Sequence, residues 1–181
     1  MKKVAALLVS GRSIYKHMAG VEAYDEKRDA RTWDAKSPAV AHPQCRCWSK
    51  SLAAQAKAPD RKGEMKLATW AVRAIRQSGG IVEQPAGSKV WGAMRMPMPN
   101  AGPDKYGGWT CYVEQRWFGY VSRKPTWLYM VGIPKHLVNP PFRMEAQKGS
   151  KAGSKQERSR TMPGLAKWLV ELATKAKKTG A

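Results

Sequence analysis

The feature that most limits the fold is a run of six apolar residues near the start of the chain, Val4 to Val9. The run lacks the polar–apolar alternation of a half-exposed strand. It therefore predicts a strand that is buried on both faces, as in a parallel sheet. Shorter apolar segments predict further strands at Val21 to Tyr24, Pro38 to Ala41, Ile81 to Val82, Trp109 to Val113 and Trp127 to Val131.

Helical spacing of apolar residues predicts a helix over Glu64 to Gln77, which Gly79-Gly80 is expected to end. A last helix is expected to begin near Pro163, with Thr161 as its cap. Strands that alternate with helices indicate an α/β fold. The sheet is expected to be open and mainly parallel, with helices on both faces.

The length of 181 residues fits a single domain, residues 1–181. Residues from about 135 to 160 are predicted to form a basic mobile loop, and the chain from Thr174 a basic tail. No apolar run approaches the roughly 20 residues that a membrane-spanning helix needs. Val4 to Val9 is also too short for a signal-peptide core, so we expect a cytoplasmic protein.

The chain carries 33 Lys and Arg residues against 13 Asp and Glu residues, a net charge of +20. Such an excess attracts polyanions, and double-stranded DNA is the expected partner. The alternatives are a solvated charged face, or binding to a ribosome or a membrane surface. Phosphate contacts are predicted for Arg46, Lys124, Lys148, Lys151, Lys155, Arg158 and Arg160.

Chemically capable residues follow three of the predicted strands: Asp25, His42 to Cys45, and Glu83. Because parallel strands place their carboxyl ends at one edge of a sheet, where ligands bind, these groups are expected to gather in one site. The three cysteines include the pair Cys45 and Cys47, without a second pair or a histidine at ligand spacing. We therefore expect reduced thiols and no metal site.

The segment Pro38-Ala-Val-Ala-His-Pro-Gln-Cys-Arg-Cys-Trp-Ser49 resembles the catalytic loop of the C5-cytosine DNA methyltransferases. In that family a strand leads into a Pro-Pro-Cys-Gln-type loop, and Cys45 matches its nucleophile, which attacks C6 of cytosine. Gly79 to Pro85 is similar to the family's strand ending in Glu-Asn-Val, and Glu83 matches the carboxyl that contacts N3 of the flipped base. Gln115 to Gly132 looks like the Gln-x-Arg-x-Arg element, with Arg123 as its arginine.

The same resemblance implies S-adenosylmethionine as cofactor and a reduced methyltransferase, Rossmann-like fold. Ser10, Gly11 and Pro43 stand where the family surrounds the cofactor, and Asp25 matches the acid that holds its ribose. The chain departs from the family in two ways. Its loop after the first strand has one glycine where the family has Phe-x-Gly-x-Gly, and it is too short for a separate target-recognition domain. This layout is similar to that of short phage and prophage proteins.

In the chemistry that the resemblance implies, a Cys45 thiolate adds to C6 and makes C5 nucleophilic. Arg46 and the positive field are expected to lower the thiol pKa. A protonated Glu83 in an apolar pocket, with a raised pKa, would draw electron density through N3. The base must first be flipped out of the duplex, at a cost of roughly a few kcal/mol.

Three functions remain open at this point. The first is a cytosine-C5 DNA methyltransferase-like enzyme. The second is a non-catalytic phage DNA-binding protein with a degenerate methyltransferase fold that antagonises restriction or host defence. The third is cysteine chemistry on a free pyrimidine nucleotide, which the charge of +20 disfavours. One or two tryptophans are expected to stack on bases, from Trp33, Trp48, Trp91, Trp109 and Trp117.

Overall fold

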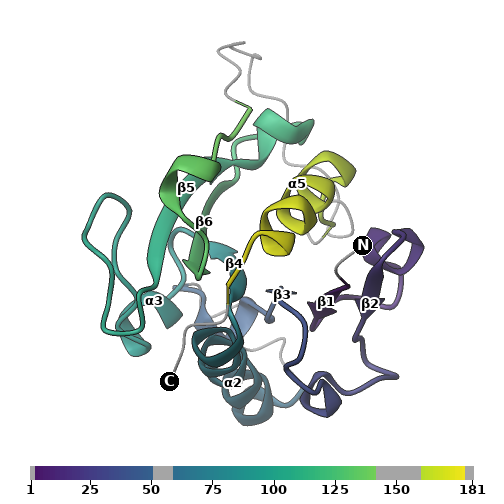
Figure 1. Cartoon of the computed structure of the whole chain (residues 1–181). Coiled ribbons are helices and arrows are strands. Elements are labelled where there is room, and N and C mark those ends of the chain that lie inside the picture. The colour runs from purple at the N-terminus through teal and green to yellow at the C-terminus, as the bar shows by residue number, and fades with distance from the viewer. Residues whose placement is uncertain (1–2, 51–58, 142–159, 178–181) are drawn as a thin grey trace.

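The computed structural model describes residues 3–50, 59–141 and 160–177, which form an α/β fold around one six-stranded sheet. The strands are β1 (Val4–Leu7), β2 (Val21–Ala23), β3 (Ala39–Ala41), β4 (Gly80–Pro85), β5 (Trp109–Glu114) and β6 (Pro125–Val131). Across the sheet they lie in the order β2-β1-β3-β4-β6-β5 (Figure 1).

One half of the sheet is parallel. β1 pairs with β2 and β3, and β3 pairs with β4, all in parallel register. All four residues of β1 are buried. Val4 and Ala6 pack into the apolar cluster on one face of the sheet, and Ala5 and Leu7 into the cluster on the other. The predicted first strand, buried on both faces, is therefore confirmed.

The other side of the sheet is antiparallel, so the sheet is mixed, and the expectation of an open, mainly parallel sheet is not confirmed. β6 pairs antiparallel with both β4 and β5. Only Gln115 to Lys124 separate β5 from β6. A parallel neighbour requires a crossover of a dozen residues or more, whereas a short connection returns the chain antiparallel. Because β4 and β5 both oppose β6, they run in the same direction.

The helix α2 (Arg61–Ser78) covers one face of the sheet and extends the predicted helix at both ends. Asp60 caps it by accepting a hydrogen bond from the Gly63 N–H at 2.8 Å. The helix ends at Gly79, whose φ is 80°, and the chain turns at once into β4. At Gly80 a Cβ atom would lie 2.1 Å from the Ala39 carbonyl oxygen, so only glycine permits β3 to approach so closely.

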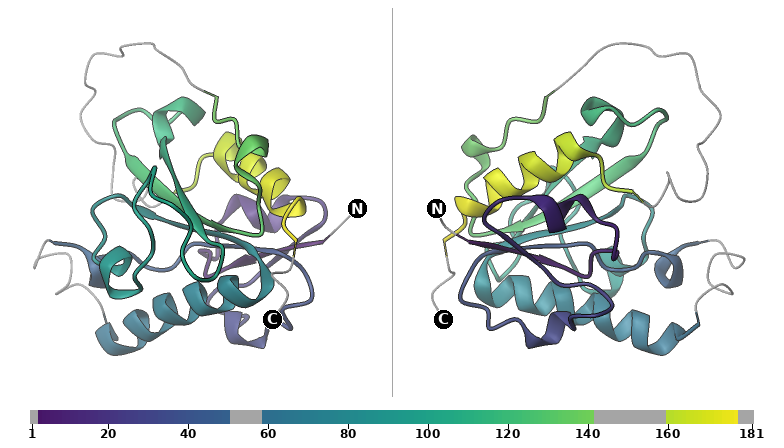
Figure 2. Two further views of the ribbon diagram at one scale, coloured as in Figure 1. Left: turned by 60° about the vertical axis from the view of Figure 1, so that its left-hand side comes forward. Right: turned by 90° about the vertical axis from the view of Figure 1, so that its right-hand side faces the viewer.

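The helix α5 (Pro163–Thr174) covers the opposite face (Figure 2), so helices lie on both faces as predicted. Pro163 begins it as expected, because proline suits the first helical turn. The predicted cap, Thr161, is wrong: the capping position is Met162, without a side-chain cap. Leu165, Leu169 and Leu172 of this helix are buried against the sheet.

The remaining described elements are short: η1 (Ile14–His17), η2 (Ala30–Thr32), η3 (Arg46–Trp48), α3 (Val90–Ala93), η4 (Gln115–Phe118) and η5 (Lys135–Leu137). Most of the predicted basic loop, residues 142–159, lies outside the described part. Within the described ranges, no helix has the length and apolar character needed to cross a membrane.

We expect Leu169→Ala to lower the free energy of unfolding by about 2–5 kcal/mol, because the side chain is fully buried between α5 and the sheet. Urea unfolding followed by circular dichroism measures the change. Lys167→Ala, at an exposed position of the same helix, is the matched control and should change stability by about 0.5 kcal/mol or less. Equal losses in the two variants would contradict the packing of α5.

Candidate functional site

The pairing of β3 with β4 builds the centre of the site. Ala41 lies opposite Val82, so the next residues of the two strands, His42 and Glu83, stand level with each other. His42 Nδ1 lies 3.0 Å from Glu83 Oε2. Both side chains are largely buried, with exposed fractions of 10% and 14%. Two of the predicted site residues therefore meet at the carboxyl end of β3. Glu83 lies within β4, however, and not beyond its end.

Tyr15 closes the other side of the histidine ring. It belongs to η1, which follows β1, and it is fully buried. Its hydroxyl lies 2.8 Å from His42 Nε2. Both ring nitrogens of His42 are thus engaged, and among the described residues the Cys45 thiol forms no hydrogen bond with His42. The site is therefore not a cysteine–histidine pair in which the ring deprotonates the thiol.

Gln115 holds the second oxygen of Glu83. It is the first residue of η4, and its Nε2 donates to Glu83 Oε1 at 3.3 Å and to Thr126 Oγ1 at 3.1 Å. Sequence reasoning named Gln115 only as the start of the segment that resembles the Gln-x-Arg-x-Arg element, and it missed Tyr15. The predicted strand ended at Val113, one residue before the end of β5, so the strand-end signal did not point to Gln115. Tyr15 carried no such signal, because its contact with His42 joins segments 27 residues apart.

Glu83 is held as a carboxylate, which corrects the expectation of a protonated acid. Burial alone opposes its ionisation. The hydrogen bond from His42, the charge of its ring, the charge of Lys124 and the hydrogen bond from Gln115 together outweigh burial and hold the Glu83 pKa below its ordinary value. A proton for N3 of a base must therefore come from another group.

Cys45 lies in an exposed loop between β3 and η3. Partial desolvation and the negative charge of Glu83 raise the pKa of its thiol, while Lys124 and Arg46 oppose the rise. The expectation that Arg46 lowers this pKa below its ordinary value is wrong. The Arg46 guanidinium is turned toward Glu64, with Nε donating at 2.8 Å and 3.0 Å to its two oxygens. Cys45 therefore rests as a thiol.

The loop that carries Cys45 is fixed from behind by β4. Gln84 is buried and donates from Nε2 to the Pro43 carbonyl oxygen. Ser88 donates to Gln84 Oε1 at 3.1 Å, which fixes the amide. The Lys89 N–H also donates to the Trp48 carbonyl oxygen at 2.8 Å. These contacts fix the position of the loop that carries the Cys45 thiol.

Arg123 does not reach this site, although the resemblance made it a site residue. Its side chain is 71% exposed and pairs with Glu114 at 3.3 Å. Glu114 is buried and also accepts from the Lys124 N–H at 3.2 Å, so it fixes the turn before β6. The cation whose charge acts on both Cys45 and Glu83 is Lys124. Lys124, which the sequence predicted to contact phosphate, therefore bears electrostatically on both groups.

The residues expected to hold S-adenosylmethionine are engaged by the protein itself. Asp25 accepts from Lys16 Nζ at 2.5 Å and from the N–H groups of Lys27 and Arg28. The hydrogen bond from Lys16 is the largest of the effects that lower the Asp25 pKa to about 2. A Cβ atom at Gly11 would lie 2.4 Å from Glu26 Oε1.

Pro43 is buried under the Gln84 amide, and only Ser10 of this set is exposed. In this arrangement the set does not fit the cofactor. Asp25 has no free oxygen directed at a ribose, and the loop after β1 is packed against Glu26 and Tyr15.

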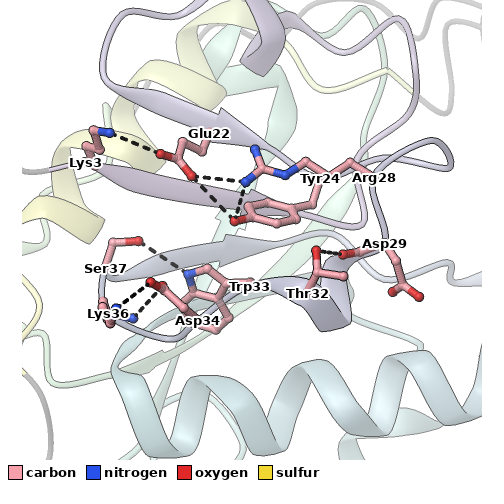
Figure 3. Close-up of polar contacts among 10 residues, drawn as sticks. All are labelled: Lys3, Glu22, Tyr24, Arg28, Asp29, Thr32, Trp33, Asp34, Lys36 and Ser37. Atoms are coloured by element: carbon pink, nitrogen blue, oxygen red, sulfur yellow. Dashed lines mark hydrogen bonds and ion pairs between the residues drawn. The ribbon is translucent and has the colours of Figure 1, made fainter.

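A hollow of about 760 Å³ lies beside β2 and away from Cys45. Figure 3 shows that its charged side chains pair with one another. Glu22 binds Lys3 at 3.3 Å and Arg28 at 3.4 Å, and Asp34 binds Lys36 at 3.5 Å. No cysteine lines this hollow, so any cysteine chemistry lies instead near the β3–β4 edge.

The tryptophans predicted to stack on bases are mostly structural. Trp33, Trp48, Trp91 and Trp117 are buried, and Trp109 donates from Nε1 to the Ile133 carbonyl oxygen. Of the predicted phosphate contacts, Arg160 is exposed as expected. Lys148, Lys151, Lys155 and Arg158 lie outside the described residues. The described ranges contain no cluster of three or more His, Cys, Asp or Glu side chains able to hold a metal ion.

No family model, no curated protein and no solved structure matches this chain.

We expect Cys45 to be alkylated before Cys111, because Cys45 is exposed and burial raises the pKa of Cys111 to about 11. Glu83→Gln removes the negative charge that opposes the Cys45 thiolate, so the Cys45 pKa should fall and alkylation at pH 8 should accelerate. Iodoacetamide labelling mapped by mass spectrometry measures both effects. Glu22→Gln, at a distant exposed acid, is the control. An unchanged rate in Glu83→Gln would show that the two groups are not coupled.

Proposed function

We propose that this chain is a DNA-modifying protein of the cytosine-C5 methyltransferase type. It takes an unpaired cytosine between Cys45 and Glu83, and the Cys45 thiolate adds to C6 of the base. The proposal places it in the cytoplasm, where the three free cysteines remain reduced. In a phage-encoded protein this would be the host cytoplasm.

The observation that supports the proposal best is the register of β3 and β4. It sets a cysteine loop and a buried glutamate side by side on neighbouring parallel strands. These are the two groups that the resemblance assigns to the base, in the order in which the resemblance places them. A carboxylate at this depth accepts a hydrogen bond from the 4-amino group of cytosine, which thymine lacks.

The fold agrees with this placement. In Rossmann-like sheets the ligand lies at the carboxyl ends of the strands, where the strand order reverses direction. Here the order β2-β1-β3-β4 reverses between β1 and β3. Tyr15, His42 and Cys45 all follow these two strands, so the proposed base site lies at the reversal point.

The proposed partner is double-stranded DNA, and the net charge of +20 supports it. A free nucleotide needs only a small basic pocket, whereas an excess of this size suits a long polyanion. Phosphate contacts would offset the roughly few kcal/mol needed to extrude a base.

The proposed reaction needs no bound cofactor. The Cys45 sulfur forms a bond to C6, the electrons of the C5–C6 double bond move toward N3, and N3 takes a proton. The enamine can then accept a solvent proton at C5. Loss of the original C5 proton, followed by expulsion of the thiolate and release of the proton from N3, restores cytosine. The net result is exchange of the C5 hydrogen with water.

S-adenosylmethionine would supply an electrophilic methyl group to the same carbon, but the described residues do not fit it. Asp25 is engaged by Lys16, and the end of the Glu26 side chain lies against Gly11 in the loop after β1. These two contacts favour a second candidate function. In this function the chain is a non-catalytic phage DNA-binding protein that occupies sites and antagonises restriction or host defence.

DNA affinity should depend steeply on salt. If five or more phosphates are neutralised, the affinity should fall by about a hundredfold or more between 50 and 200 mM salt. Fluorescence anisotropy with a labelled duplex measures this dependence. A flat response over that range would remove the electrostatic support for a nucleic-acid partner.

We expect the protein to exchange the C5 hydrogen of cytosine in DNA for deuterium in D₂O. The exchange is read by mass spectrometry of the digested nucleosides. A long mixed-sequence duplex and its single-stranded form are both needed, because the target sequence is unknown. Cys45→Ser should abolish the exchange, whereas Cys111→Ser, the matched control at a cysteine of β5, should leave it unchanged.

Tight DNA binding without exchange in either substrate would overturn the catalytic proposal in favour of the binding-only candidate. Addition of S-adenosylmethionine to the same reaction should yield no 5-methylcytosine. Its appearance would show that the loop after β1 opens to admit the donor.

A further inference from the structure

His42 lies at the centre of a buried chain of three titratable side chains. Its Nε2 faces the Tyr15 hydroxyl at 2.8 Å, and its Nδ1 faces Glu83 Oε2 at 3.0 Å. The three groups come from η1, the end of β3 and β4. The ring of His42 also packs against Tyr15, with ring centroids 5.2 Å apart. Of these three side chains, the proposed reaction so far uses only Glu83.

The partners determine which nitrogen of His42 carries the proton. Ionised Glu83 can only accept, so Nδ1 must donate to it. Burial raises the pKa of Tyr15 well above its ordinary value, so the phenol keeps its proton. In neutral His42, Nε2 accepts from that hydroxyl. In cationic His42, Nε2 donates to the phenol oxygen instead. The ring therefore gains or loses a proton without losing either hydrogen bond.

The proposed addition to C6 requires a proton at N3 of the base, and resting Glu83 holds none to give. Gln115, the other donor to Glu83, is an amide and cannot supply a proton. Histidine is the side chain that gains and loses a proton near neutral pH. His42 is the hydrogen-bonded neighbour of Glu83 with that capacity.

We propose that His42 is the proton reservoir of the base site, from which Glu83 passes a proton to N3 as Cys45 adds to C6. This inference rests on the proposed function. In the step, the S–C6 and N3–H bonds form, the Nδ1–H bond of cationic His42 breaks, and Glu83 is a carboxylate before and after. Tyr15 is the positioning residue that keeps the ring oriented in both of its states.

The proton on the His42–Glu83 pair also affects the Cys45 nucleophile. The negative charge of Glu83 opposes the Cys45 thiolate, and a proton held by the His42–Glu83 pair offsets that charge. The charged and titratable groups that bear on this pair are Tyr15 from η1, Cys45 from the loop after β3 and Lys124 from the turn before β6. The protonation that prepares N3 therefore also favours the nucleophile.

The test is the pH profile of C5 deuterium exchange. The wild-type profile should be bell-shaped: the acid limb follows the Cys45 thiolate, and the alkaline limb follows loss of the His42 proton. His42→Gln keeps a donor to Glu83 but carries no mobile proton. Its rate should fall by about a hundredfold or more, with loss of the alkaline limb and nearly unchanged DNA affinity. His17→Gln, an exposed histidine of η1, is the matched control.

Tyr15→Phe removes only the hydroxyl, so it should shift the alkaline limb while retaining much of the rate. An independent readout is the ¹⁵N spectrum of the His42 ring in the wild-type protein, which should show the Nδ1–H form at alkaline pH. An Nε2–H form there would overturn the inference without reference to activity.

An unaltered pH profile in His42→Gln, with exchange retained, would overturn the reservoir and leave the proposed function standing. If the wild type binds DNA but shows no exchange, the proposed function fails, and the reservoir fails with it.

Discussion

The site depends on one backbone interaction, the parallel pairing of β3 with β4. A shift of one residue in that register would turn His42 and Glu83 to opposite faces of the sheet. The register is fixed by Gly80, where β3 approaches too closely for any side chain, and by α2, which packs over both strands. Cys45 follows His42 by three residues, so the same strand pairing also sets where the Cys45 loop begins at the edge of the sheet.

The buried carboxylate is stable only because its neighbours supply donors. An ionised group at an exposed fraction of 14% loses hydration, and losing its partners would leave an uncompensated charge that costs several kcal/mol. His42 and Gln115 each donate to one oxygen of Glu83, and Lys124 adds a positive charge nearby. The same carboxylate helps to keep Cys45 protonated: partial burial raises the pKa of the thiol most, and the negative charge of Glu83 raises it further.

Local patterns in the sequence predicted much of the fold. The run Val4 to Val9 indicated a doubly buried strand, and the spacing from Glu64 to Gln77 indicated the helix α2. These features depend on neighbours a few residues away. The antiparallel placement of β6 depends on which strand it joins across the sheet, and no local pattern encodes that choice.

Sequence patterns also predicted some residues of the candidate site, but not their protonation states. The end of β3 located the loop of Cys45, since a polar group after an apolar strand is a local signal, whereas Glu83 lies within β4 and not at its end. The pKa directions were wrong because they depend on distant partners. Arg46 pairs with Glu64, 18 residues along the chain, and Glu83 receives its donors from residues 41 and 32 positions away. The position of Arg123 depends on a partner that the sequence did not indicate. In the structure it pairs with the buried carboxylate of Glu114.

Tyr15 connects the loop after β1 with the edge of the sheet that carries His42 and Glu83. The loop after β1 leads into η1, in which Tyr15 is fully buried. The Tyr15 hydroxyl then reaches His42 across the reversal point of the strand order. A buried residue of η1 therefore orients the His42 ring beside Glu83. In the proposed function, the segment in which the resemblance places the methyl donor supports the side chains that face the base.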